Sequence, residues 1–137
     1  MLNIVIPMAG RGSRFADVGY KMPKPLIDVL GKPMIQWVIE NLKPSCDHQF
    51  IFICQQEHME RYQLDVLLEK SAPGSKIVAI PKVTEGAACT VLLSEDLIDN
   101  DDPLMIANSD QWIDFDINQY LDYQFNSNLD GLILTMT

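Results

Sequence analysis

The sequence predicts an α/β fold, a doubly wound Rossmann-like three-layer sandwich with a mostly parallel sheet. Short apolar runs rich in Ile and Val recur along the 137 residues, and segments of helical periodicity lie between them. This alternation favours parallel strands joined by right-handed crossovers, with helices on both faces of the sheet. The length and the 47% hydrophobic content suit a single domain, residues 1–137, with a core of its own.

Five segments are predicted to be strands because each is brief, apolar and bounded by Gly, Pro or Asn. They are residues 3–7, 49–54, 76–80, 103–107 and 131–137. The last run resembles a core strand, yet no covering helix follows it in the sequence. The domain is therefore expected to be truncated at its C-terminus.

Four helices are predicted between and after these strands. Pro33 opens the first, since proline is favoured at the first helical position, and this helix ends before Pro44. Residues 57–70 and 86–93 are further candidates. The last helix begins near Asp116, which has the spacing of a capping box with Gln119.

The distribution of charge limits the classes of partner. The net charge of −9 argues against nonspecific binding of nucleic acid, which needs a basic surface. Residues 1–43 nevertheless carry +3, from six basic and three acidic side chains, while the remaining residues carry −12. A small cationic region on an acidic body suits a phosphorylated small molecule.

Neither a membrane span nor a secretory leader is predicted, because the opening apolar run is too short for the first and lacks the basic start of the second. The three cysteines have no disulfide or zinc spacing. We therefore expect a cytoplasmic protein with reduced thiols and no membrane partner.

A glycine-bearing loop, Ala9-Gly10-Arg11-Gly12-Ser13-Arg14-Phe15, follows the first strand. Glycines let backbone N–H groups approach a phosphate, and Arg11 and Arg14 would supply charged donors, although a tight turn with solvated arginines explains the same residues equally well. An NAD site is disfavoured because Phe15 replaces the third glycine of the dinucleotide fingerprint, and Gln55 stands where that fingerprint needs an acidic residue. The Gly-Lys-Ser/Thr of a P-loop is missing too.

Two further residues could act on a polyanion. Lys24 lies between Pro23 and Pro25, which would hold its ammonium in place at a small entropy cost, although a surface lysine in a rigid loop fits as well. Asp110 follows the fourth predicted strand, and ligands bind at this end of the strands in such sheets. One carboxylate with phosphate oxygens and waters is a usual arrangement for Mg²⁺, whereas Asn-Ser-Asp is also a good turn.

Together these motifs resemble the sugar-phosphate nucleotidyltransferase family, in its N-terminal nucleotide-binding portion. The matching segments, in the same order and spacing, are residues 9–15, 23–26, 31–34, 84–88 and 108–110. The resemblance implies that Arg14 and the glycine loop grip a triphosphate, that Lys24 contacts phosphate and that Asp110 binds Mg²⁺.

The resemblance further implies which residues bind the nucleotide. They are Ala9, Gly10, Arg11, Gly12 and Ser13 of the loop, with Thr84 and Gly86 of the segment that reads base and sugar. The glutamine that family members often carry in that segment is missing here, so the base stays open. A tightly packed helix start explains residues 86–88 equally well.

The implied reaction transfers a nucleoside monophosphate from a nucleoside triphosphate to a sugar 1-phosphate, giving a nucleotide sugar for surface polysaccharide and pyrophosphate. A nucleotide-binding module without turnover and a choline-phosphate cytidylyltransferase-like enzyme are the alternatives. A glycosyltransferase is a weaker one, because Asn108 stands at the first position of its Asp-x-Asp motif.

Family members usually run on for roughly another hundred residues, and in related folds a later strand inserts beside the fourth. A sheet without that strand would have an unpaired edge, so we expect either self-association into a homo-oligomer through that edge or poor stability of the chain alone.

Overall fold

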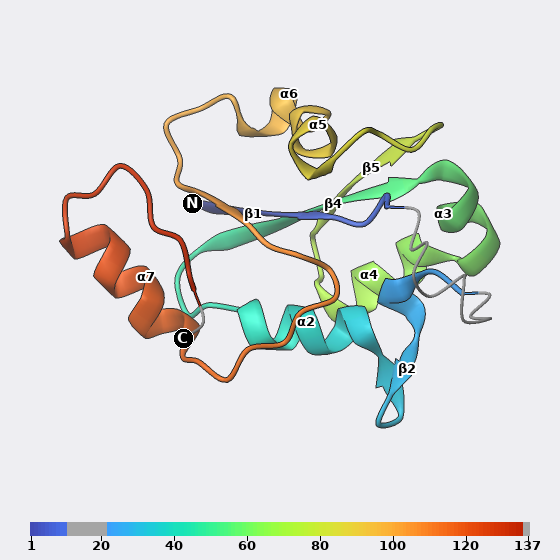
Figure 1. Cartoon of the computed structure of the whole chain (residues 1–137), viewed down its shortest axis with the longest axis horizontal. Coiled ribbons are helices and arrows are strands. Elements are labelled where there is room, and N and C mark those ends of the chain that lie inside the picture. Colours follow the sequence, from blue (N-terminus) through green and yellow to red (C-terminus); the bar gives the residue numbers. More distant parts are fainter. Residues whose placement is uncertain (11–21, 136–137) are drawn as a thin grey trace.

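The computed structural model describes residues 1–10 and 22–135 of the chain (Figure 1). Its main sheet has the order β5-β4-β1-β6, and the paired strands are parallel, which confirms the predicted fold class. The strands are β1 (Leu2–Pro7), β4 (His48–Gln55), β5 (Lys76–Ile80) and β6 (Leu104–Ile106). A separate antiparallel hairpin consists of β2 (Asp28–Val29) and β3 (Lys32–Pro33), and the short helix η1 (Lys24–Leu26) precedes it.

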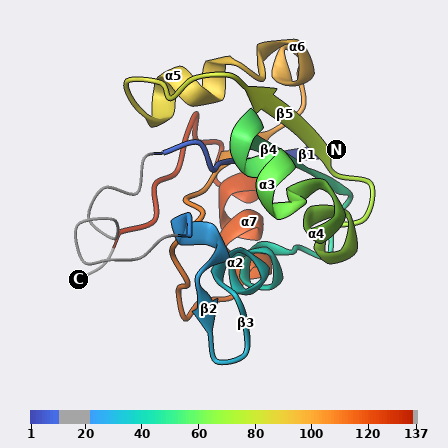
Figure 2. The same ribbon diagram turned by 90° about the vertical axis from the view of Figure 1, so that its right-hand side faces the viewer.

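Helices cover both faces of the main sheet (Figure 1). On one face lie α2 (Met34–Leu42), α4 (Leu64–Ser71) and α7 (Ile117–Asn126), and on the other lie α5 (Ala87–Leu92) and α6 (Glu95–Ile98). Figure 2 shows these layers from the side, with α3 (Gln56–Tyr62) directly after β4. Across the described ranges, no helix has the length and apolar content needed to cross a membrane.

The core lies on both sides of β1. Ile4 and Ile6 pack in the cluster beneath α2, α4 and α7, whereas Val5 packs in the cluster beneath α5, and all three side chains are fully buried. A parallel strand buried on both faces needs apolar residues at every position rather than at alternate ones. This requirement explains the apolar runs Ile4–Ile6 in β1 and Phe50–Cys54 in β4, all of whose residues are buried.

The helix predicted over residues 57–70 is wrong as a single element. It consists of α3 and α4, and between them Gln63 adopts a left-handed backbone conformation with φ 51° and ψ 48°. The break changes the direction of the chain, so that α4 buries Leu64 and Leu68 while α3 has no fully buried residue. Packing of these leucines therefore overrides the local periodicity that suggested one helix.

Two predicted helix starts have different outcomes. Pro33 is not the first helical residue, because it is extended at φ −58° and ψ 145° and pairs with Asp28 in the β2–β3 hairpin. Asp116 caps α7 as predicted, since its Oδ1 accepts a hydrogen bond from the Asn118 N–H at 2.9 Å.

The strand predicted over residues 131–137 is wrong for residues 131–135, the part that the structure describes, because none of them is in a strand. A strand needs a partner along its length, and this segment bonds to side chains of α7 instead. Tyr120 Oη donates to the Leu132 carbonyl at 2.9 Å, and Gln124 Nε2 donates to the Leu129 carbonyl at 3.0 Å.

The two faces of α4 should differ sharply in their contribution to stability. Leu68 is 0% exposed and Val66 is 63% exposed. We expect Leu68→Ala to lower the free energy of unfolding by about 2–5 kcal/mol, because it leaves a cavity in the core, and Val66→Ala to change it by less than about 0.5 kcal/mol. Urea unfolding of both variants tests this, and equal losses would contradict the described packing of α4.

The three cysteine thiols should differ in reactivity. Cys54 is buried, and burial raises the pKa of its thiol to about 12, whereas Cys46 and Cys89 are exposed. Because the thiolate is the reactive species, we expect an aromatic disulfide reagent at pH 8 to modify Cys46 and Cys89 in the native protein and Cys54 only after denaturation. Mass spectrometry of the modified peptides identifies each site, and rapid native modification of Cys54 would show that its burial is wrong.

Candidate functional site

The carboxyl ends of β1 and β6 bring two predicted site segments to the same edge of the sheet. The two strands are parallel neighbours, and Val5 pairs with Ile106. One residue further on, the Ala107 N–H donates to the Val5 carbonyl at 3.0 Å. The chain then leaves both strands, so the loop that begins at Ala9 and the loop that carries Asp110 start side by side.

A cavity of about 240 Å³ lies at this edge. Six of the predicted site residues line it: Ala9, Gly10, Lys24, Thr84, Gly86 and Asp110. The structure thus brings together residues from four separate segments of the chain. Their chemical roles stay predictions. The other predicted site residues, Arg11, Gly12, Ser13 and Arg14, lie outside the described residues.

Lys24 is held by the short helix that its neighbouring prolines initiate. The Leu26 N–H donates to the Pro23 carbonyl at 2.9 Å, and Pro25 and Leu26 are buried beneath the turn. These anchors fix the backbone at Lys24. Its Nζ lies 3.5 Å from Asp110 Oδ2, and both side chains keep partial contact with solvent, at 26% and 39% exposure.

The loop that carries Asp110 is fixed from α2. The Asn41 side chain forms two hydrogen bonds with the backbone of Ile113: its Nδ2 donates to the carbonyl at 2.9 Å and its Oδ1 accepts from the N–H at 3.1 Å. Closer to the cavity, Asn108 Nδ2 donates to Gln111 Oε1 at 2.9 Å. These bonds order the loop on either side of Asp110 without using the carboxylate itself.

The opposite wall of the cavity is a small hydroxyl network at the start of α5. The hydroxyls of Thr84 and Thr90 bond to each other, and each also lies within bonding distance of the Gly86 carbonyl, at 3.2 and 3.1 Å. Thr90 is buried and was missed by sequence reasoning. Because Thr90 Oγ1 helps fix Thr84 and Gly86, it completes this wall.

Among the described residues that line the cavity, Asp110 is the one carboxylate that could bind a metal ion. The part of the chain that the structure describes contains no group of three or more His, Cys, Asp or Glu side chains suited to a metal ion. Mg²⁺ is commonly bound through one or two carboxylates, waters and substrate phosphates. Asp110 therefore fits an ion that arrives with a polyphosphate, and does not form a complete cage by itself.

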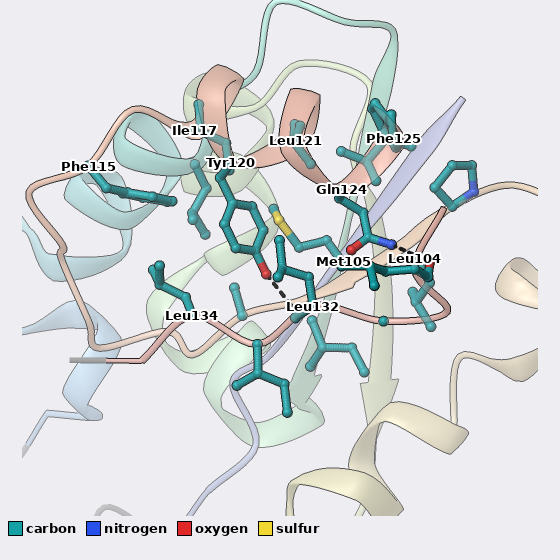
Figure 3. A pocket seen from close by; sticks show the side chains of 18 of the residues that line it. Leu104, Met105, Phe115, Ile117, Tyr120, Leu121, Gln124, Phe125, Leu132 and Leu134 are labelled. Atoms are coloured by element: carbon teal, nitrogen blue, oxygen red, sulfur yellow. Dashed lines mark hydrogen bonds between the residues drawn. The ribbon is translucent and has the colours of Figure 1, made fainter. Parts of the chain in front are cut away.

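A larger groove of about 850 Å³ lies between β6, α7 and residues 129–134 (Figure 3), and Asn108 lines both this groove and the smaller cavity. Its lining is mostly apolar, and Figure 3 shows Ile117, Leu121 and Leu132 facing into it. Asp130 is the one charged residue among the described residues that line it. Without a cation the groove does not suit a triphosphate. The outer edge of β6 lies at this groove, and Leu104 and Ile106 of that strand are about half exposed. Self-association through this strand edge stays a prediction.

Gln55 is a further residue that sequence reasoning did not assign to the site. It ends β4, and its side-chain amide donates to the carbonyls of Ala9 and Gly10. The one sequence signal that could have pointed to Gln55 is its position at the carboxyl end of a predicted central strand. Its donor role depends on a contact across 46 residues of sequence, which no local pattern reveals.

The fold and the cavity define a Rossmann-like α/β domain with a polar site at the carboxyl ends of its parallel strands. A family model described as Nucleotidyl transferase matches residues 4–137, and the chain belongs to this family. The predicted family is therefore confirmed.

Individual relatives agree with this membership. The N-acetylmuramate α-1-phosphate uridylyltransferase of Neisseria meningitidis serogroup B is 29% identical over 116 residues, which are 84% of this chain and 49% of the relative. A Bacillus anthracis structure assigned as a glucose-1-phosphate thymidylyltransferase matches with a TM-score of 0.75 and 25% identity, over 93% of this chain and 52% of that one. The nucleoside-diphosphate-sugar pyrophosphorylase of Vibrio cholerae RC9 matches with a TM-score of 0.61 and 25% identity, over 85% and 52%. The chain thus spans about half the length of each of these proteins.

The Lys24–Asp110 ion pair should contribute little to folding. Both side chains are partly exposed, so water screens the pair, and we expect a coupling free energy of about 0.2–1 kcal/mol. A double-mutant cycle with Lys24→Met and Asp110→Asn, measured by urea unfolding, gives this value. A coupling of several kcal/mol would show that the pair is a buried structural bridge rather than an available site.

Proposed function

We propose that this chain is the nucleotide-binding part of an enzyme that transfers a nucleoside monophosphate from a nucleoside triphosphate to a sugar 1-phosphate. The single observation that carries the proposal is the convergence of Gly10, Lys24 and Asp110 on one cavity at the strand ends. Membership of the Nucleotidyl transferase family supports the reaction class. The lysine and the backbone suit phosphate oxygens, and the carboxylate suits their metal ion.

In the proposed reaction, a phosphate oxygen of the sugar 1-phosphate attacks the α-phosphorus of the triphosphate. The new P–O bond forms as the bond from the α-phosphorus to the bridging oxygen breaks, and pyrophosphate leaves with that electron pair. The nucleophile is already an anion, so no general base is needed. Catalysis is then mainly alignment of the two phosphates and neutralisation of their charge.

Each residue has a role that follows from its chemistry. Lys24 offsets negative charge near the α-phosphate, while the Gly10 N–H, together with Arg14 as predicted from the sequence, stabilises the departing pyrophosphate. Asp110 would hold Mg²⁺, whose positive charge would offset the negative charge of the phosphate oxygens. Lys24 Nζ and Asp110 Oδ2 lie 3.5 Å apart, so the ammonium and the carboxylate could serve one phosphate and its metal ion together.

The acceptor class is supported by the names of the relatives, since those from Neisseria and Bacillus are both named for sugar 1-phosphates. Those names differ in the base, uridylyl in one and thymidylyl in the other. We therefore propose a sugar 1-phosphate as acceptor and leave the base open, with Thr84 and Gly86 on the wall that reads it. From the family resemblance we further propose that the product serves synthesis of surface polysaccharide.

Substitution of Asp110 should separate activity from stability. We expect Asp110→Asn to lower Mg²⁺-dependent pyrophosphate release in the whole protein by about 100-fold or more, because the metal loses its protein carboxylate. Its unfolding midpoint should hardly change, since the side chain is partly exposed. Asp114→Asn is the matched control, because Asp114 is an exposed carboxylate of the same loop that does not line the cavity.

The assay is run with ATP, GTP, CTP, UTP and dTTP and with a panel of sugar 1-phosphates. Wild-type activity that survives in Asp110→Asn would remove this residue from the mechanism. Triphosphate binding by calorimetry without any pyrophosphate release would instead favour a binding module without turnover.

A further inference from the structure

The side chain of Gln55 bridges the end of β4 and the loop that leaves β1. Its Nε2 lies 3.0 Å from the carbonyl oxygen of Ala9 and 3.3 Å from that of Gly10. A carboxamide nitrogen carries two hydrogens, and both partners are carbonyl oxygens, which only accept. One side-chain group therefore holds two successive peptide units.

Strand pairing cannot hold these peptides. The ladder between β1 and β4 ends where the Met8 N–H donates to the Ile53 carbonyl at 2.7 Å. Beyond that bond the chain has left β1, and the carbonyls of Ala9 and Gly10 are bonded by the Gln55 amide. The Gln55 side chain therefore fixes the backbone of two further residues, Ala9 and Gly10, beyond the end of β1.

Holding the carbonyls also sets the direction of an N–H group. In a trans peptide the C=O and the N–H point to opposite sides, so the Ala9 carbonyl bonded to Gln55 directs the Gly10 N–H away from Gln55. Ala9 and Gly10 line the cavity that contains Lys24 and Asp110, whereas Gln55 does not. A fixed backbone N–H at the edge of such a cavity is a donor for an anion.

We propose that Gln55 is a positioning residue for polyphosphate, which holds the Ala9–Gly10 backbone so that the Gly10 N–H donates to a phosphate oxygen of the bound triphosphate. This inference rests on the proposed function. Gln55 acts through the loop and does not itself touch the substrate. Because the Ala9–Gly10 backbone is held before the ligand arrives, binding loses less conformational entropy.

The test uses Gln55→Glu, which keeps the shape of the side chain but places acceptor oxygens against two carbonyls. Gln56→Glu is the matched control, because Gln56 is the next residue and its Nε2 donates within α3, to Glu60 Oε1 at 2.7 Å, rather than to the Ala9–Gly10 backbone. Inorganic tripolyphosphate with Mg²⁺ is the probe, measured by calorimetry on the whole protein. The backbone amide resonance of Gly10 is followed by NMR in the same titration.

We expect wild type and Gln56→Glu to bind tripolyphosphate equally, with a shift of the Gly10 amide resonance. Gln55→Glu should bind about tenfold more weakly, the size of effect that one hydrogen bond produces, and should lose most of that shift. If Gln55→Glu fails to fold, Gln55→Met, which removes the donors without adding charge, takes its place with the same expectation.

A Gln55 variant that is less stable but binds tripolyphosphate as wild type does would overturn the inference, since Gln55 would then be structural only. Lys24→Met separates the two proposals. Weak binding by Lys24→Met with full binding by Gln55→Glu would overturn the role of Gln55 and leave the proposed function standing. If wild type binds no tripolyphosphate, both proposals are wrong.

Discussion

The parallel pairing of β1 with β4 on one side and β6 on the other is the constraint on which the site depends. These pairings run from Leu2↔His48 to Pro7↔Ile53 and from Asn3↔Leu104 to Val5↔Ile106. They end the three strands at one edge of the sheet, so that the loops after β1 and β6 and the start of α3 leave side by side. Burial of β1 on both faces maintains this register, because a slip would move apolar residues out of both clusters.

The sheet determines where the loops begin, and side chains determine their course from there. Gln55 binds the loop after β1, Asn41 binds the loop after β6, and the buried Leu26 anchors the turn at Lys24. Gln55 and Asn41 belong to β4 and α2, and each holds a loop from another part of the chain, whereas Leu26 belongs to the same short helix as Lys24. These anchors hold the backbone of the site, whereas the side chains of Lys24 and Asp110 line the cavity.

The sequence predicted those parts of the fold whose signal is local. Strands such as β4 are evident because burial on both faces requires an apolar run, and Asp116 is evident because a cap acts within one turn. Residues 131–135 have the same apolar pattern, yet a strand also needs a partner, which the pattern does not report. Lys24 was predicted from its flanking prolines and Asp110 from its place at a strand end, whereas Thr90 and the role of Gln55 depend on tertiary contacts.

The place of β6 beside β1 has a consequence for the order of assembly. Asn3 pairs with Leu104, roughly a hundred residues later, whereas β4 and β5 are made sooner and reach their partners over shorter loops. Contacts between distant parts of a chain form slowly, because a long loop must close first. On a ribosome, β1, β4 and β5 can meet while the residues of β6 are still unmade. We therefore expect the carboxylate of Asp110 to be the last of the three converging groups to arrive, so that a nascent chain cannot bind its ligand before this sheet is complete.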